Sequence, residues 1–279
     1  MRTQPVGRYV YWSERLVSEV VEDNGIQLDT AVKSTLKLGA LGNGIDVTRA
    51  DRSSTRFDVA EKLKKKLGRR LAEHGTPGPV QLVHGSGWVE VAEFQRWGAR
   101  PEHSLRQRTA ILHTQTHSPR GQRTDLCLFG SLKNLQGYTV PDEPVGGWVS
   151  SSAPAIEEFV ASRGAGTSMS AVFDAEGIAV EALRVAMDQG VYAHPDEHRG
   201  RPETRAFTVL GFEACEYVVR IYQDVTLTPG RWDFRTEPDL AGAERIMIGA
   251  PLWMRTVRPE TIRTYGGANR VVLTSRTAH

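Results

Sequence analysis

The sequence has 279 residues, of which 39% are hydrophobic and 24% charged, and its formal net charge is +2. These values are ordinary for a folded globular protein of one large or two average domains, and they exclude long disordered segments. So small a net charge does not indicate a nucleic-acid partner, and no apolar run reaches the length of a membrane-spanning helix or a signal-peptide core. We therefore expect a cytoplasmic protein without a membrane partner that binds a small molecule or another protein, and homo-oligomers are left open.

A strand connected tightly to a helix is predicted at the start of the chain. Residues 8–12 alternate in character as a strand does, and Ser13 then provides a helix N-cap. Apolar residues recur at helical spacing until Gly25, where the helix is expected to end. Ser13 and Arg15 are the first side chains after the strand that a ligand could reach, so both are candidate ligand-binding residues, although capping alone accounts for Ser13.

The rest of the chain alternates between helices and short strands. A helix over 55–74 carries an apolar stripe and a basic face, and a helix over 171–189, apolar on most faces, is expected to be buried. Strands are predicted at residues 80–83, 88–94, 108–117, 124–129, 205–212, 215–227, 243–254 and 269–275. The glycine-rich segment 39–54 lacks the spacing of a phosphate-binding loop and is interpreted as a surface loop. The pattern predicts an α+β or α/β fold, with a mixed, largely antiparallel sheet flanked by helices.

Two segments resemble each other, one in each half of the chain. Each is a short apolar strand that ends at a glycine, Gly130 or Gly249, and is followed by a segment that closes on proline. Glycine in a strand marks a bulge or a close backbone approach, and exposed amides there can face a ligand. Gly130, Ser131 and Gly249 are therefore candidate ligand-binding residues. The similarity also raises the hypothesis of two related lobes, 1–163 and 164–279, joined in one continuous globular unit.

Three histidines form a candidate metal site. His113 and His117 lie four residues apart on a predicted strand, so both project from one face, and His84 ends another strand. Strand-borne imidazoles bind zinc in some enzymes. However, the HTQTH segment contains no carboxylate that could orient a ring through its second nitrogen. Zinc is therefore a candidate cofactor but not a favoured one, and no other cofactor is indicated.

The sequence contains no complete catalytic signature. Cys127 and Cys215 are isolated in apolar runs, which is typical of buried, reduced thiols. Arg163 and Ser168 share residue types with ADP-ribosyltransferases but lack a Glu-x-Glu partner. We favour a binding or interaction protein that holds a small anion, a nucleotide or a partner chain. The alternative is an enzyme, either metal-dependent or ADP-ribosyltransferase-like.

Two short motifs resemble a group of uncharacterised actinobacterial proteins. These proteins open on a Tyr-x-Tyr-x-Ser strand–helix element, which Tyr9, Tyr11 and Ser13 match. They also carry a Gly-Ser-Pro strand end, which Gly249 and Pro251 match, although alanine replaces the serine between them. The resemblance is confined to these motifs and implies a bacterial cytosolic α/β protein, without implying an activity.

Overall fold

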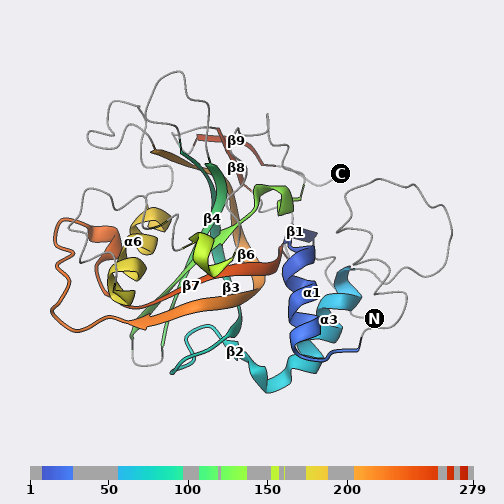
Figure 1. Ribbon diagram of the computed structural model, residues 1–279. Helices are drawn as coiled ribbons and strands as arrows, with labels where there is room; N and C mark the ends of the chain where they lie inside the picture. The colour runs from blue at the N-terminus through green and yellow to red at the C-terminus, as the bar shows by residue number, and fades with distance from the viewer. Residues whose placement is uncertain are drawn as a thin grey trace.

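The computed structural model describes residues 8–27, 56–96, 107–118, 121–136, 152–156, 160, 174–187, 204–256, 263–266 and 271–275. For residues 90–96, 107–108, 204–213, 263–266 and 271–275 it describes the backbone alone. Within these ranges helices pack against a mixed, mostly antiparallel sheet, so the predicted α+β class is confirmed (Figure 1). No helix in this part of the chain is long and apolar enough to cross a membrane. Segment 39–54, Arg163 and Ser168 lie outside the described residues.

The strands are β1 (Arg8–Trp12), β2 (Leu71–Glu73), β3 (Leu82–Arg96), β4 (Gln107–His117), β5 (Arg123–Gly130), β6 (Thr204–Thr226), β7 (Ala243–Thr256), β8 (Arg263–Gly266) and β9 (Val271–Ser275). The helices are α1 (Glu14–Asp23), α3 (Arg56–Leu67) and α6 (Ala175–Met187), and short 3-10 turns are η1 (Gly68–Arg70), η2 (Leu132–Asn134) and η4 (Pro238–Leu240). The predicted strand–helix opening, the 108–129 hairpin and the buried helix near 180 are confirmed.

Three predicted boundaries were wrong. The helix predicted over 55–74 ends at Leu67, because Gly68 has a positive φ of 49° and the chain then turns into β2. The strands predicted at 80–83 and 88–94 are one strand, β3, and the two strands predicted between 205 and 227 are one strand, β6. Both β3 and β6 continue through these places because each pairs with the other along its length.

Five of the described strands close into a ring. β3, β4 and β5 form an antiparallel meander, and β7 lies parallel to β5. β7 also pairs antiparallel with β6, and β6 returns to β3. The order β3–β4–β5–β7–β6 therefore ends where it begins, which makes a small closed barrel with Greek-key connectivity, the group that includes OB-type barrels. β1 extends this sheet beside the end of β7, and β8 and β9 extend it beside β6.

The barrel has an apolar interior, because alternate side chains of a strand face opposite sides. Every ring strand contributes to one buried cluster. Its members on the ring strands are Val83, Val89, Ala110, Leu112, Leu126, Leu128, Cys215, Tyr217, Val219, Ile221, Met247 and Met254. The alternate residues face outward, and many of them are covered by helices. α6 packs over β4, β5 and β7, whereas α1 and α3 pack over β6 and β7 on the opposite side (Figure 1). The two cysteines are both free and buried, as the sequence predicts.

The two similar segments lie side by side within one sheet. They form β5 and β7, which pair in parallel, with Leu128 opposite Gly249. The ring takes β3, β4 and β5 from before residue 163, as a three-strand meander, and β6 and β7 from after it, as an antiparallel pair. The hypothesis of two related lobes, 1–163 and 164–279, stays a prediction.

Gly249 is required for barrel closure. It lies at a bulge between β6 and β7, where an added Cβ would meet the Arg220 carbonyl oxygen at 2.1 Å. We expect Gly249→Ala to lower the free energy of unfolding by about 3 kcal/mol or more, since the backbone of β6 must move. In the matched control Gly87→Ala, the nearest atom is Thr114 Oγ1 at 3.6 Å, an ordinary contact, and we expect a change below about 1 kcal/mol. Chemical denaturation measures both, and equal losses would contradict this account.

Candidate functional site

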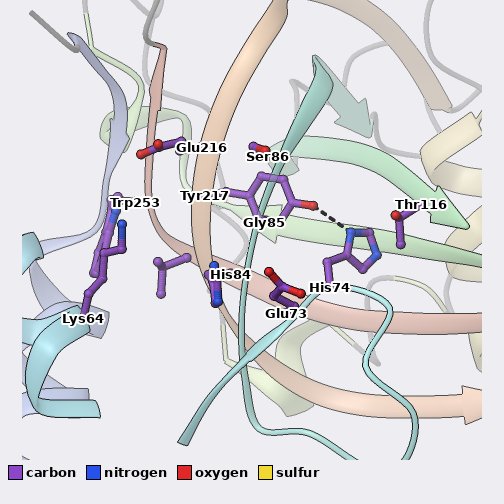
Figure 2. A pocket seen from close by; sticks show the side chains of 11 residues that line it. Lys64, Glu73, His74, His84, Gly85, Ser86, Thr116, Glu216, Tyr217 and Trp253 are labelled. Atoms are coloured by element: carbon purple, nitrogen blue, oxygen red, sulfur yellow. Dashed lines mark hydrogen bonds between the residues drawn. The ribbon is translucent and has the colours of Figure 1, made fainter. Parts of the chain in front are cut away.

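A pocket of about 310 Å³ opens beside β2, and we call it the β2 pocket. Its walls come from α3, β2, β3, β4, β6 and β7, and the residues that line it are Lys64, Glu73, His74, His84, Gly85, Ser86, Thr116, Glu216, Tyr217, Val218 and Trp253 (Figure 2). The lining therefore combines charged groups of both signs, imidazoles and hydroxyls with two buried aromatic residues, Tyr217 and Trp253. This volume is at the lower end of the range for small-molecule sites.

The floor of the β2 pocket is a hydrogen-bonded histidine–tyrosine pair. His74 Nδ1 lies 2.6 Å from the Tyr217 hydroxyl (Figure 2). The Tyr217 hydroxyl also bonds with the Thr114 side chain. Gly85 makes room for this arrangement, because a Cβ at that position would lie 2.5 Å from the Tyr217 hydroxyl oxygen. The glycine in β3 is thus a packing requirement of the floor.

Both members of this pair are uncharged at neutral pH. Burial lowers the pKa of His74 to about 4, and the attraction of Asp125 opposes that shift only in part. Burial also raises the pKa of Tyr217 well above its ordinary value. A contact with the Thr124 backbone raises the pKa of His74, but it is the smallest of the contributions. The buried Nε2 atom of His74 has no hydrogen-bond partner among the described residues. The hydrogen bond between these two uncharged side chains therefore makes the floor both fixed and neutral.

His74 begins a segment that crosses beside the pocket, residues 74–79, which we call the strap. Arg245 donates to the carbonyl oxygens of Thr76 and Gly78, and it forms a bidentate ion pair with Asp224. Asp224 in turn accepts from the Val80 amide at 3.2 Å. A second pocket of about 260 Å³ is lined by Gly75, Pro77, Gly78, Pro79, Ser118, Gln122, Thr124, Asp224, Thr226, Glu244 and Arg245. The strap therefore contributes residues to both pockets and is held by polar contacts.

Two of the predicted ligand-binding residues belong to α1. Ser13 is buried, and its hydroxyl accepts from the Leu16 amide at 3.4 Å, so it is the helix N-cap. Arg15 forms an ion pair with Glu19 one turn along the helix. Neither residue lines the β2 pocket or the second pocket.

The candidate ligand-binding residues at the two strand-ending glycines, Gly130, Ser131 and Gly249, serve the packing of the barrel. An added Cβ at Gly130 would lie 2.3 Å from the Tyr11 hydroxyl, so this glycine admits a buried tyrosine from β1. Ser131 caps η2 by accepting from the Lys133 amide at 3.3 Å. Gly249 forms the bulge between β6 and β7. These contacts explain the residues, and none of the three lines either pocket.

The three candidate metal ligands lie in different surroundings. His84 lines the β2 pocket, whereas His117 is exposed at the end of β4. His113 lies 3.0 Å from the buried Asp125, which also accepts two bonds from Arg123. Burial alone would raise the pKa of Asp125, but these bonds outweigh it and hold the pKa below its ordinary value. In the described part of the chain, no three His, Cys, Asp or Glu side chains are grouped to hold a metal ion.

The HTQTH segment itself contains no carboxylate, but Asp125 on the neighbouring strand β5 supplies one to His113.

The residues that the sequence did not indicate are His74 and Tyr217, which are 143 positions apart. The one local signal was the glycine at position 85, in a segment that otherwise continues as a strand.

The chain was compared with protein-family models, curated proteins and solved structures, and none of them matches it. The function of the β2 pocket must therefore be argued from its own geometry.

His74 predicts a pH dependence of stability. Its pKa is about 4 in the folded protein and 6.5 ordinarily, so the unfolded chain binds more protons between these values. The free energy of unfolding should therefore fall as pH drops from 6.5 towards 4, by about 2 to 3 kcal/mol from this group. His74→Asn keeps an acceptor for Tyr217 but cannot be protonated, so the fall should be smaller by that amount. Urea denaturation at pH 7 and pH 4 measures it.

The matched control is His117→Asn, which removes an exposed imidazole from the end of β4. Identical pH dependence in the wild type and in His74→Asn would contradict the assignment of this slope to the pocket floor.

Arg245→Ala should loosen the strap. The variant loses two bonds to strap carbonyls and leaves Asp224 without its ion pair. We expect amide hydrogen exchange at Thr76 and Val80 to accelerate at least tenfold, because local opening of the strap becomes easier. Arg235→Ala, which removes a highly exposed partner of Asp233, is the control and should leave these amides unchanged. Unchanged exchange in Arg245→Ala would show that other contacts hold the strap.

Proposed function

We propose that this chain is a cytoplasmic ligand-binding protein that holds a small polar molecule in the β2 pocket. The observation that carries the proposal is the neutral His74–Tyr217 floor, fixed by a 2.6 Å hydrogen bond in a pocket of about 310 Å³. A preformed concave site with a few convergent polar groups is the usual form of a small-molecule site.

The floor supports binding because it is already ordered. Tyr217 is held by both His74 and Thr114, and its ring lies against Gly85. A ligand therefore meets side chains whose positions are fixed before it arrives, and little conformational entropy is lost on association. Charged and hydroxyl groups stand around this floor on α3, β2, β3 and β4, where they can select the ligand.

The covering of the barrel favours a small molecule over a nucleic-acid strand. In OB-type barrels the face of the second and third strands binds oligonucleotides. The corresponding strands here are β4 and β5, and their outward residues Ile111, Cys127 and Phe129 are buried against α6. The alternative of a zinc enzyme gains no support from His84, His113 and His117, which do not form a metal-holding group.

The test is a thermal-shift and native mass spectrometry screen of polar metabolites, repeated on a variant with the pocket filled. Ser86 is exposed and lines the β2 pocket, so Ser86→Phe should occupy it with little effect on the fold. We expect at least one metabolite to bind the wild type and to lose at least tenfold in affinity in Ser86→Phe.

The matched control is Gln122→Phe, at an exposed residue that lines the second pocket. It should bind as the wild type does. A ligand whose affinity falls in Gln122→Phe but not in Ser86→Phe would move the site to the second pocket and overturn the proposal.

A further inference from the structure

The charges around the β2 pocket are balanced on one side. Lys64 lies 3.7 Å from Glu61, and Arg255 lies 3.2 Å from the same carboxylate. Arg255 also pairs with Glu216 at 2.6 Å. Two cations and two carboxylates therefore form a connected group, and the two members that line the pocket, Lys64 and Glu216, each have an opposite charge nearby.

Glu73 is outside this balance. It lines the pocket, and among the described residues no cationic side chain pairs with its carboxylate. Its neighbours at the floor, His74 and Tyr217, are neutral for the reasons given above. The carboxylate of Glu73 is thus the one charge of the described pocket lining that lacks a counter-charge.

The groups around Glu73 can complete the recognition of an amine. Glu73 stands opposite His84 in the register of β2 and β3, and Figure 2 shows it between His84 and His74. Ser86 and Thr116 supply hydroxyl groups in the same pocket. A protonated amine donates up to three hydrogen bonds, and a carboxylate with neighbouring hydroxyl acceptors satisfies that geometry.

We propose that the ligand of the β2 pocket carries a protonated amino group that pairs with Glu73, together with polar groups that bond to the surrounding hydroxyls and imidazoles. This inference rests on the proposed function of the pocket. A carboxylate at the edge of a low-dielectric cavity attracts a cation more strongly than one on an open surface.

The experiment compares amines with alcohols of the same shape. The probes are tyramine with tyrosol and histamine with histaminol, titrated against the protein while the indole resonance of Trp253 is followed by NMR. We expect the amine of at least one pair to bind at least tenfold more tightly than its alcohol. Glu73→Gln, which keeps the shape and removes the charge, should abolish that preference.

Glu22→Gln is the matched control, because Glu22 is an exposed carboxylate of α1 that lines neither pocket. It should keep the preference for the amine. Equal binding of amine and alcohol, or an amine preference that survives in Glu73→Gln, would overturn the amine class.

Ser86→Phe separates the two proposals. Alcohols that bind as well as amines, but only when Ser86 is present, would leave the pocket function standing and overturn the amine. Binding of neither probe of either pair would also overturn the amine class as stated, while the metabolite screen decides the function of the pocket independently.

Discussion

The pairing of β7 with β5 on one side and with β6 on the other is the constraint on which this structure depends. Without it β6 would still pair with β3, but the sheet would stay open and its apolar face would be exposed. With it, the inward residues of five strands share one interior. The same strand carries Arg245 near its start, Gly249 at its bulge and Trp253 near its end, so it also places the anchor of the strap and one wall of the pocket.

Closure of the barrel sets the chemistry of the pocket floor. Tyr217 points into the interior cluster, and the strap brings His74 against its hydroxyl. Burial keeps the imidazole neutral, which opposes stability at acid pH because the unfolded chain takes up the proton more readily. An apolar side chain at position 74 would avoid this loss of stability at acid pH. A buried imidazole that lowers stability beside a cavity supports the proposed role of this pocket in ligand binding.

Local features of the fold could be predicted from the sequence, and long-range ones could not. The cap at Ser13, the apolar stripe of α1 and the β4–β5 hairpin depend on residues close in sequence. In contrast, Gly85 resembles a turn residue because the reason for it, the ring of Tyr217, lies far along the chain. His74 was missed for the same reason, since its role depends on a strap that bends at Gly75 and Gly78, both with positive φ. Periodicity does not report which distant strands will meet.

The basic face of α3 shows how position changes the meaning of a charge. From the sequence, Lys62, Lys65 and Lys66 belong to a basic face that is expected to be solvated. In the structure Lys65 and Lys66 are exposed, whereas Lys64, which is not part of that predicted face, lines the β2 pocket and approaches Glu61. Its charge is thereby taken up within the balanced group that includes Arg255, and it does not neutralise Glu73 across the pocket. An amine-selective pocket can therefore exist beside a basic helix, because the nearest lysine is already paired and the unpaired carboxylate belongs to another element, β2.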